Sequence, residues 1–401
     1  MYDHLKIRQL SPSTNTLYVE VAQKDTKSYI WLMQLRKILL RELRAYIDSD
    51  EYKTSTYIPI SRHRALSHIQ NPRAKPDDLV LVLVYEAGAM VGYLGVLADD
   101  LHFDTDIAHV GWLSCMWVNP IMRGKGVAMQ LLQTVFEAWN YQILVTEFTP
   151  AAYGLYQKTG QFIDLAKPKG VRGYLRLNLH YLLPNKNPKW NKWKPLLKLV
   201  DGSFNVWKDW RNKRTLKAIT AACPRFEYVP KVDEESWQLI QQCSPTLVNR
   251  QKEDLEWIAD NPWLLSGGLL ADANAKRYHF SSVASFFSFL HIKVYNDQQE
   301  LVAFVILSIR NQHLKVPYAY FKPAAAGAVM QVVYQHLLTH QLDMLTLFQP
   351  DLVAYIAKEK NPFFKTRELQ RHYIIGKALA EPLHAMSNIT IQDGDADAVF
   401  T

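Results

Sequence analysis

The chain has 401 residues but only three cysteines, Cys115, Cys223 and Cys243. They are odd in number, and no two of them form a C-x-x-C pair. Such a sparse set excludes a disulfide framework and a cysteine-based zinc site, and it is typical of a reducing compartment. We therefore expect a cytoplasmic protein that binds no metal.

Long apolar segments are also missing. No run of eighteen apolar residues occurs, and the first ten residues, M-Y-D-H-L-K-I-R-Q-L, contain no apolar signal region. We therefore expect neither a membrane-spanning helix nor a secretion signal. Hydrophobic residues still make up 48% of the sequence, which is enough to fill a sizeable core. At this length we expect two or three domains.

Positive charge is concentrated in one segment. Residues 185–217 contain ten Lys or Arg and two Asp, so the segment carries a formal charge of +8. The whole chain also carries +8, and the remainder is therefore close to neutral. A protein that binds nucleic acid usually spreads basic residues over a folded domain. We therefore expect no DNA partner.

The stretch from Val118 to Ala128, V-N-P-I-M-R-G-K-G-V-A, combines glycines with basic residues. It follows a predicted strand, 110–117, and leads into a predicted helix with apolar residues at helical spacing. Glycines let a backbone approach a ligand closely, and N–H groups at a helix N-terminus attract anions. The stretch therefore predicts a pyrophosphate site at Arg123, Gly124, Lys125 and Gly126.

Two common phosphate loops do not fit this stretch. A Walker loop needs Ser or Thr after its Lys, and here Gly126 follows Lys125. A Rossmann loop needs G-x-G-x-x-G after the first strand, and only its first half is present. The pattern that fits is R-x-x-G-x-A, which resembles the acetyl-CoA loop of the GNAT N-acetyltransferase superfamily and adds Val127 and Ala128 to the predicted site. The alternative is a basic surface turn that caps an ordinary helix.

A second stretch, A-A-Y-G-L-Y-Q-K-T-G-Q-F, resembles the second GNAT motif, A-x-x-L-Y-x-x-x-G-F, with Gln161 inserted. The resemblance implies that the pantetheine arm of acetyl-CoA contacts Ala152 and also Thr149, where the family often has Asn. It further implies that the fourth and fifth strands part to admit this arm. The backbone groups that would pair with it are those of Met116, Trp117 and Val118.

The activity implied by the resemblance is acetyl transfer from acetyl-CoA to an amine. An N–H group of Met116 or Val118 would polarise the thioester carbonyl. Tyr156 matches the Tyr of the motif, and a phenol can protonate a departing thiolate; Tyr153 is its rival. Glu147 is the candidate base, with a water chain as the alternative. The acidic tail, 392–401, is a further possibility, since some two-lobed GNAT aminoglycoside acetyltransferases place their C-terminus in the first active site.

The sequence predicts the acceptor only as an amine on a small molecule or a peptide. A second lobe would help to shape the cleft that holds it. The alternative is a non-catalytic acyl-CoA-binding scaffold or sensor protein, for which the departures at Thr149 and Gln161 leave room. Aminoacyl transfer from tRNA is a third possibility, with only the basic segment in its favour.

The order of predicted elements repeats along the chain and indicates an α/β (α+β) fold. We expect two GNAT-like mixed β-sheet lobes with helices on both faces, a catalytic lobe at 1–184 and a degenerate lobe at 225–401. The first lobe is predicted to contain strand 5–10, helix 30–47, hairpin 78–97, strand 110–118, a helix, strand 142–148, the Tyr156 helix and strands near 162 and 174–179. The second is predicted to contain strand 226–232, helix 233–242, strands 287–295, 301–310 and 313–321, helix 325–340, strand 345–348, helix 352–357 and strand 371–376.

The corresponding loop of the second lobe, K-P-A-A-A-G at 322–327, lacks the R-x-x-G-x-G/A pattern, so we expect no acetyl-CoA there. Residues 185–224 are predicted to form a basic, Trp-rich amphipathic linker that is interrupted at Gly202. Such a helix can lie on an anionic membrane. Because Asp201 and Asp209 interrupt its basic face, we favour a helix wedged between the two domains and expect no membrane surface contact by residues 190–214.

Overall fold

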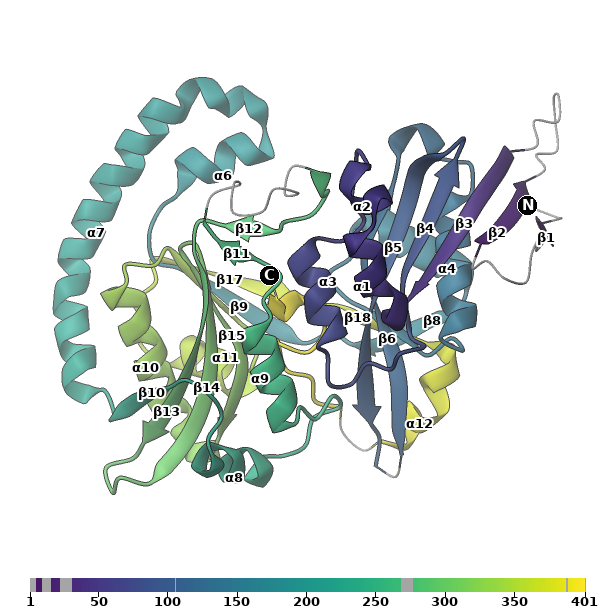
Figure 1. The fold of residues 1–401 in the computed structure, drawn as a ribbon. Coiled ribbons are helices and arrows are strands. Elements are labelled where there is room, and N and C mark those ends of the chain that lie inside the picture. Colours follow the sequence, from purple (N-terminus) through teal and green to yellow (C-terminus); the bar gives the residue numbers. More distant parts are fainter. Residues whose placement is uncertain are drawn as a thin grey trace.

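Two β-sheets lie side by side in the protein, and a long helix runs along the outer side of the second (Figure 1). The structure is a computed structural model and describes residues 5–8, 16–21, 31–104, 106–267, 277–386 and 389–400. The sheets have nine and seven strands, and each mixes parallel with antiparallel pairs. The predicted α/β architecture of two mixed-sheet lobes is confirmed.

The first sheet has the order β1-β2-β3-β4-β5-β6-β7-β18-β8. Its strands are β1 (Leu5–Arg8), β2 (Thr16–Val21), β3 (Trp31–Leu39), β4 (Leu79–Glu86), β5 (Ala89–His102), β6 (Ile107–Val118), β7 (Ile143–Val145), β18 (Tyr373–Gly376) and β8 (Phe162–Ala166). One face is covered by α4 (Val127–Ala138), which packs on β4, β5 and β6. The other carries α1 (Leu40–Asp48), α2 (Asp50–Thr54) and α3 (Arg62–Ile69).

The second sheet has the order β10-β13-β14-β15-β16-β9-β17. Its strands are β10 (Phe226–Val229), β13 (Phe287–Tyr295), β14 (Leu301–Arg310), β15 (His313–Phe321), β16 (Met344–Leu347), β9 (Lys169–Tyr174) and β17 (Lys365–Gln370). The strands predicted at 287–295, 301–310 and 313–321 are confirmed at these bounds. A small parallel pair joins β11 (Leu265–Ser266) to β12 (Val283–Ala284).

Both faces of the second sheet are buried. The helices after the connector are α8 (Glu234–Gln242), α9 (Lys252–Asp260), α10 (Ala326–Thr339), α11 (Pro350–Lys358) and α12 (Ala380–Ala385). Successive side chains of a strand point to opposite faces. Phe304 and Ile306 of β14 therefore join the cluster that includes α8, while Val305 and Leu307 join the cluster beneath α10. The apolar run of this strand follows from burial on both sides.

The two lobes exchange one strand each. β9 is inserted between β16 and β17 of the second sheet, and β18 is inserted between β7 and β8 of the first. The strand predicted at 174–179 in the first lobe is therefore wrong in both position and sheet. It spans Lys169–Tyr174, and α6 (Leu179–Lys186) begins where the prediction ended. The division of the chain at 184 and 225 stays a prediction, but the strands do not follow it.

The helix predicted at 30–47 is also wrong. Its first part is β3, which lies between β2 and β4, and only its second part is helical, as α1. Leucines spaced by three and four residues fit a helix, but Met33 and Leu35 alternate into the core of a strand. Pairing with two neighbouring strands overrides the local helical preference. Ile30 lies outside the described residues, as do Gln9 and Leu10 of the predicted first strand.

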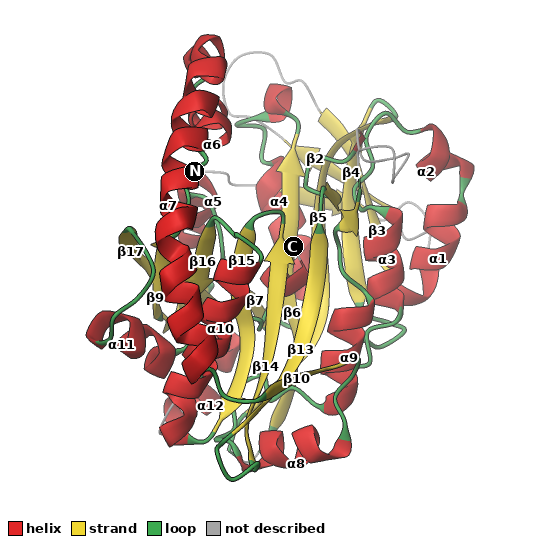
Figure 2. Ribbon diagram, turned by 90° about the vertical axis from the view of Figure 1, so that its left-hand side faces the viewer, coloured by secondary structure: helices red, strands yellow, loops and turns green. Residues whose placement is uncertain are grey.

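The connector comprises α6, a 3₁₀ turn at Pro188–Trp193 and the long helix α7 (Lys194–Ala222). The predicted interruption at Gly202 is wrong, because α7 passes through this position and a side chain there would meet nothing within 4 Å. Figure 2 shows α7 along the outer side of the second lobe, where it packs on α10. The prediction of a helix wedged between the lobes is therefore wrong. No helix in the described ranges is long and apolar enough to cross a bilayer.

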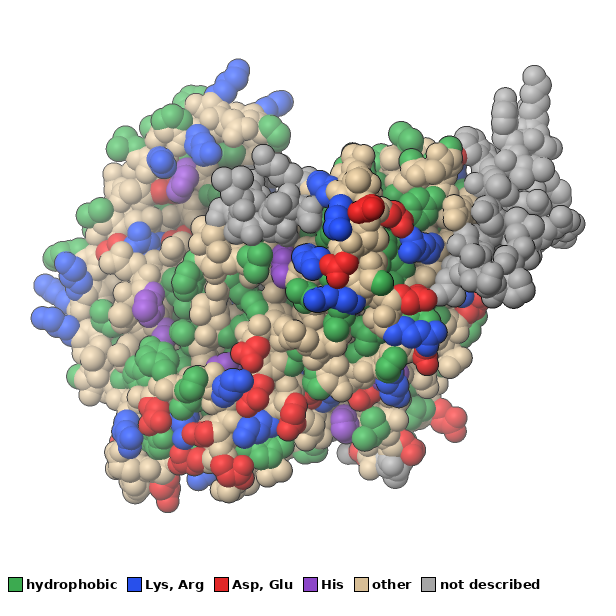
Figure 3. Space-filling model, in the orientation of Figure 1, with side chains coloured by type: hydrophobic (Ala, Val, Ile, Leu, Met, Phe, Trp, Pro, Cys, Tyr) green, Lys and Arg blue, Asp and Glu red, His purple; other side chains and the backbone are tan. Residues whose placement is uncertain are grey.

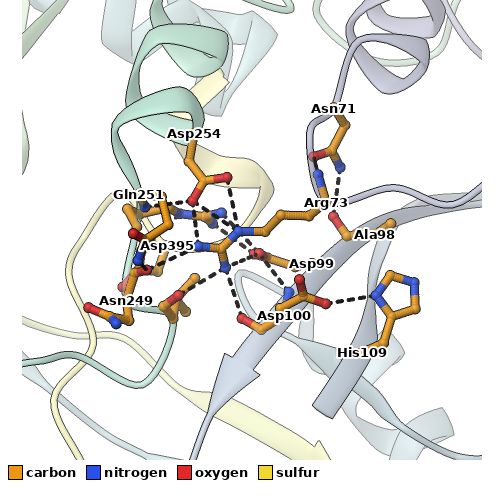
Figure 4. A network of polar contacts seen from close by, with 12 residues as sticks. Asn71, Arg73, Ala98, Asp99, Asp100, His109, Asn249, Gln251, Asp254 and Asp395 are labelled. Atoms are coloured by element: carbon orange, nitrogen blue, oxygen red, sulfur yellow. Dashed lines mark hydrogen bonds and ion pairs between the residues drawn. The ribbon is translucent and has the colours of Figure 1, made fainter. Parts of the chain in front are cut away.

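A buried ionic network ties the two lobes together (Figure 4). Arg73 bridges Asp99 of β5, at 2.9 Å, and Asp254 of α9. Arg250 binds the same Asp99 at 2.7 Å and lies 3.4 Å from Asp395 of the C-terminal tail. The two guanidinium groups outweigh the effect of burial and hold the pKa of Asp99 below its usual value. A buried pair that loses one partner leaves an uncompensated charge, so this network fixes the position of the tail.

Candidate functional site

The strands β6 and β7 pair only at Gly111 and Trp112, opposite Ile143 and Leu144, and then part. β6 continues to Val118 without β7 beside it. The space between them belongs to a cavity of about 340 Å³. Its two facing walls are lined by Ser114, Cys115 and Met116 and by Thr146, Glu147 and Phe148.

A β-bulge in β6 re-aims the backbone beside this cavity. Leu94 of β5 lies opposite two residues, Cys115 and Met116, and Cys115 has a φ of 58°. A bulge leaves a residue out of the ladder and turns its backbone groups aside. Met116, predicted to contact the cosubstrate, lines the cavity. The predicted contacts Trp117 and Val118 remain in the ladder, opposite Tyr93 and Gly92, and the Trp117 ring stacks on His279.

The predicted pyrophosphate loop turns into α4 through two left-handed glycines. Gly124 has a φ of 80° and Gly126, the N-cap of α4, a φ of 79°. Residues with side chains rarely adopt this backbone conformation, although a Cβ at either position would point into open space. The N–H groups of Val127 and Ala128 lie in the first turn of α4, where intrahelical acceptors are lacking. The exposed Arg123 and half-buried Lys125 add positive charge, so the loop fits the pyrophosphate of an acyl-CoA.

Helix α5 (Pro150–Thr159) brings three of the predicted residues to the cavity wall: Thr149, Ala152 and Tyr156. Thr149 is the N-cap, and its hydroxyl accepts a hydrogen bond from the Ala152 N–H at 3.2 Å. Tyr156 is buried, and its pKa is raised above the usual value by burial and then by the charge of Asp397. Its rival Tyr153 stacks on Phe148, with ring centres 5.3 Å apart.

Glu147, the predicted base, is engaged in an ion pair. Its Oε1 lies 2.8 Å from Nη2 of Arg371, a residue at the crossing from β17 to β18. Arg371 also binds the buried Asp393 at 2.6 Å. The backbone of Glu147 has a φ of 53°, which is unusual for a residue with a side chain. Glu147 therefore lines the cavity with its carboxylate turned to a cation of the second lobe.

The C-terminal tail brings a second carboxylate to the cavity. Asp397 lines it and accepts a hydrogen bond from the Ser114 hydroxyl. The Arg64 guanidinium donates to the Ser114 Oγ and to the Tyr278 hydroxyl, each at 2.9 Å, and lies 3.9 Å from the centre of the Trp263 ring. Burial raises the pKa of Asp397 above its usual value, although Ser114 and Arg64 act in the opposite direction.

Aromatic packing holds this tail in place. The Phe400 ring stacks on the Trp263 ring, with ring centres 4.6 Å apart. The backbone carbonyl of Phe400 also accepts a hydrogen bond from the backbone N–H of Trp263 at 3.0 Å. Sequence reasoning considered the tail but missed Arg64, Ser114 and Tyr278. These three lie far apart along the chain, and no motif spacing connects them to the loop at 123–128. Thr401 lies outside the described residues.

The second sheet repeats the parting strands, but the space beside its bulge is a smaller cavity of about 240 Å³ that the tail lines with Gln392 and Asp393. β15 and β16 pair only at 313–315 opposite 344–346, and Leu307 lies opposite a two-residue bulge, Val316 and Pro317. The tail occupies this bulge. The Gly394 N–H donates to the Pro317 carbonyl at 2.8 Å, and the Ala319 N–H donates to Oε1 of Gln392 at 2.9 Å. The backbone groups that would receive a ligand here are therefore paired within the chain.

Metal ligands are not gathered at this site or elsewhere in the described part of the chain, where no three His, Cys, Asp or Glu side chains are placed to hold an ion. The cavity instead gathers backbone groups of a bulge, a phenol, and a carboxylate beside a guanidinium. This set can polarise a carbonyl, donate a proton and accept one.

Residues 76–160 match the family model of the acetyltransferase (GNAT) domain. No curated protein sequence matches the chain. Solved structures with a similar arrangement include a probable N-acyltransferase from Enterococcus faecalis (9% identity, TM-score 0.47, 85% of this chain and 72% of that one covered). N-myristoyltransferase from Saccharomyces cerevisiae with bound myristoyl-CoA (10%, 0.46, 89% and 88%) and a putative acetyltransferase from Pyrococcus horikoshii (12%, 0.42, 88% and 93%) are also similar.

Proposed function

We propose that the protein transfers an acetyl group from acetyl-CoA to an amine, a proposal supported by the match of residues 76–160 to the acetyltransferase (GNAT) domain. The observation that carries the proposal is the cavity between β6 and β7. There the bulge at Cys115 and Met116, the Tyr156 phenol and the Asp397 carboxylate line one space of about 340 Å³. The loop at 123–128 supplies the anion site expected for the donor.

In this proposal acetyl-CoA supplies an activated thioester, and the protein binds, polarises and moves protons. The left-handed glycines and the first turn of α4 hold the pyrophosphate, together with Arg123 and Lys125. Thr149 and Ala152 face the pantetheine arm from α5. A backbone N–H group, either that of Met116 in the bulge or that of Val118 in the ladder, stabilises negative charge on the carbonyl oxygen as the amine attacks.

Tyr156 is the proposed general acid. Its raised pKa keeps the phenol protonated throughout the neutral range, which a proton donor requires. Asp397 is the better-placed base, because it lines the cavity and burial raises its pKa above the usual value. Glu147 stays a candidate base, but it would first have to leave Arg371.

The proposal is tested by incubating the protein with acetyl-CoA and a panel of amines while free thiol is measured. We expect amine-dependent thiol release, with kcat roughly 10²-fold lower in Asp397→Asn. A base acts only when deprotonated, so kcat should rise with pH through the raised pKa of Asp397, and this limb should vanish in the variant. Glu147→Gln is the matched comparison: if it, rather than Asp397→Asn, removes the limb, Glu147 is the base.

A non-catalytic acyl-CoA sensor is the competing function. It predicts tight acetyl-CoA binding by calorimetry with no thiol release for any amine. That combination would end the proposal of catalysis while leaving the cosubstrate site in place.

A further inference from the structure

A second cavity, of about 500 Å³, adjoins the first between the two lobes. Glu147, Phe148 and Arg310 line both cavities, so the two spaces meet at the parting of β6 and β7. Its remaining walls come from β9, from the start of β15, from the end of β16 and from the segment that joins β17 to β18.

The walls of this second cavity are strongly basic. Four cationic side chains face one lining carboxylate, that of Glu147; the four are Arg172, Arg310, Lys315 and Arg371. Arg371 is already bound to Glu147 and Asp393. Arg172 and Arg310 instead donate to neutral hydroxyls, Thr346 Oγ1 at 2.8 Å and Ser281 Oγ at 3.1 Å. Neither of them forms an ion pair with a residue that the structure describes.

The positive charge of the cavity contributes to a lowered pKa of its histidine His313. Burial, followed by the charges of Lys315, Arg172 and Arg310, lowers the pKa of His313 to about 3. A partly buried guanidinium without an anion loses hydration and gains little in return. An anion placed between Arg172 and Arg310 would offset this cost, and the planar guanidinium matches a carboxylate or a phosphate by paired hydrogen bonds.

We propose that the second cavity binds an anionic group of the acceptor, a carboxylate or a phosphate, held by Arg172 and Arg310. This inference rests on the proposed function, because it assigns the cavity to the amine that is acetylated. Arg310 lines both spaces, so an acceptor held there by its anion lies beside the cavity that contains Asp397. The acceptor class is then an amine that carries a negative charge a few bonds from its nitrogen.

The test compares acceptors that differ only in the anion. Tyrosine is paired with tyramine to probe a carboxylate, and glucosamine 6-phosphate with glucosamine to probe a phosphate. We expect one of the charged members to have the lower KM. Arg172→Gln and Arg310→Gln should raise that KM roughly 10- to 100-fold and leave the KM of its neutral partner unchanged. Arg310→Lys should recover part of the loss, and Arg44→Gln, on the far α1, should change nothing.

Equal KM values within both pairs, or Arg variants that affect charged and neutral acceptors alike, would overturn the inference and leave the proposed function standing. Acetyl-CoA binding without transfer to any amine would instead overturn the proposed function. In that case calorimetric titration of the CoA-saturated protein with inorganic phosphate still decides the anion site. Binding that is lost in Arg172→Gln supports the site, and no binding in the wild type removes it.

The long helix α7 of the connector faces the protein mainly with polar side chains over residues 197–212. The side chains of α7 that are buried are Leu197, Asp201, Lys208 and Asn212. Asp201 accepts from the N–H groups of Leu179 and His180 at 3.0 and 2.9 Å, and Lys208 donates to the Pro362 carbonyl at 2.8 Å. Polar contacts therefore hold the first part of the helix, where most apolar side chains are turned outwards, whereas Leu216 and Ile219 near its end pack against the core beneath α10.

Of fifteen large hydrophobic side chains that are exposed in the described part of the chain, nine lie between residues 181 and 210. They are Tyr181, Trp190, Trp193, Leu196, Leu199, Val200, Val206, Trp207 and Trp210. Leu196, Leu199, Val206 and Trp210 recur at intervals of three, seven and four residues, which places them on one face of α7. Contiguous exposed apolar surface of this kind marks an interaction site.

Exposed basic residues flank this apolar face. They are Lys186, Lys189, Lys192, Lys194, Lys198, Arg211, Lys213, Arg214 and Lys217. Figure 3 shows Lys and Arg side chains along the outer edge of this region, at the top and on the left. Arg211 and Arg214 also lie over the rings of Trp207 and Trp210. An apolar face rich in Trp with a basic border matches the chemistry of an anionic lipid surface.

Contrary to the expectation from the sequence for residues 190–214, we therefore also propose that the arm formed by residues 179–217 docks on the surface of an anionic membrane. Flotation with phosphatidylcholine vesicles that contain phosphatidylglycerol should carry the protein upwards, and phosphatidylcholine alone should not. Replacing Lys189, Lys192 and Lys194 by Gln should weaken binding roughly 100-fold. The double variant Leu199→Gln and Val206→Gln should abolish flotation, while Phe286→Gln, an exposed apolar residue elsewhere, should float as the wild type does.

A wild-type protein that fails to float with anionic vesicles would overturn this proposal. Sedimentation equilibrium tests for the other possible occupant of the apolar face, a second copy of the chain. If the wild type forms a dimer and does not float, and the double variant Leu199→Gln and Val206→Gln is a monomer, the apolar face binds that second copy.

Discussion

The two lobes place the same elements around the same parting of strands, and they differ in the residues that lie against it. Thr146, Phe148 and Pro150 of the first lobe have counterparts two hundred positions later in Thr346, Phe348 and Pro350. Thr149 and Gln349 cap the following helices in the same way. In the first lobe the bulge borders a cavity, whereas in the second it binds the tail of the chain.

Three differences separate the first lobe from the second. Where the first bulge has Met116, the second has Pro317, which has no N–H to donate. Where the first helix has Tyr156, the second has Ile356. The glycine loop at 123–128 is replaced by a turn that begins with Pro323. Each change removes one requirement of acyl transfer, and the tail pairs with the backbone of the second bulge. In our proposal one lobe therefore catalyses and the other only supports it.

The largest expected effect comes from separating the lobes. A chain that ends at Pro184 lacks β18, so the edge of β7 and the contacts of the fully buried Ile374 are lost. We expect this fragment to be insoluble, without a cooperative melting transition, and to become soluble when residues 185–401 are co-expressed. A soluble fragment 1–184 with its own sharp transition would show that the lobes are independent.

Next in size is the effect on cosubstrate binding. Gly126→Val places a side chain on a left-handed backbone, a strain on the order of 1–3 kcal/mol, so acetyl-CoA affinity should fall roughly 10- to 100-fold in calorimetry. A variant in the corresponding loop of the second lobe, Lys322→Ala, should bind as tightly as the wild type. Equal losses in the two variants would mean that both loops bind acetyl-CoA and that the contrast is wrong.

The third prediction concerns the helix residue that differs. Tyr156→Phe should lower kcat roughly 10²-fold and leave the KM for acetyl-CoA unchanged, because only the proton donor is lost. Since the pKa of Tyr156 is raised, the wild-type rate should not fall at alkaline pH through this group until well above its usual range. Tyr153→Phe serves as the control. A drop in kcat for Tyr153→Phe alone would transfer the role to Tyr153.

The smallest effect is expected from loosening the tail. A Cβ at Gly394 would lie 2.4 Å from the Tyr318 ring, so Gly394→Ala should cost about 1–3 kcal/mol of unfolding free energy. Displacing the tail should also lower kcat, because Asp397 is three residues further on. Gly202→Ala, in open space on α7, should instead stabilise the protein by about 0.5–1 kcal/mol. Thermal melting measures both, and unaltered activity in Gly394→Ala would separate the tail from catalysis.

Much of the first site could be predicted from the sequence, because its parts are local. The loop at 123–128 and the helix of Tyr156 are continuous stretches whose glycines, caps and periodicity are visible in the letters. The strands at 287–321 were predicted equally well, since apolar runs and turns define them. The region at 30–47 failed because its leucines satisfy a helical spacing and a strand alternation at once, and only the neighbouring strands decide between them.

What could not be predicted depends on contacts between distant segments. The local sequences of Lys169–Tyr174 and Tyr373–Gly376 do not indicate which sheet each strand joins. Asp397 meets Ser114 across almost three hundred residues, and no spacing encodes such a meeting. The sequence of α7 shows an apolar stripe, but which side faces solvent follows from polar anchors such as Asp201.

The exchange of β9 and β18 also has a consequence for synthesis on the ribosome. The first sheet cannot close until Tyr373–Gly376 has emerged, more than two hundred residues after β7. At the usual pace of about 5–20 residues per second, the unpaired edge of β7 waits for roughly 10–45 s. During that interval the nascent chain exposes strand edges that invite mispairing, so its yield in the cell should depend on chaperones that shield the first lobe until the second arrives.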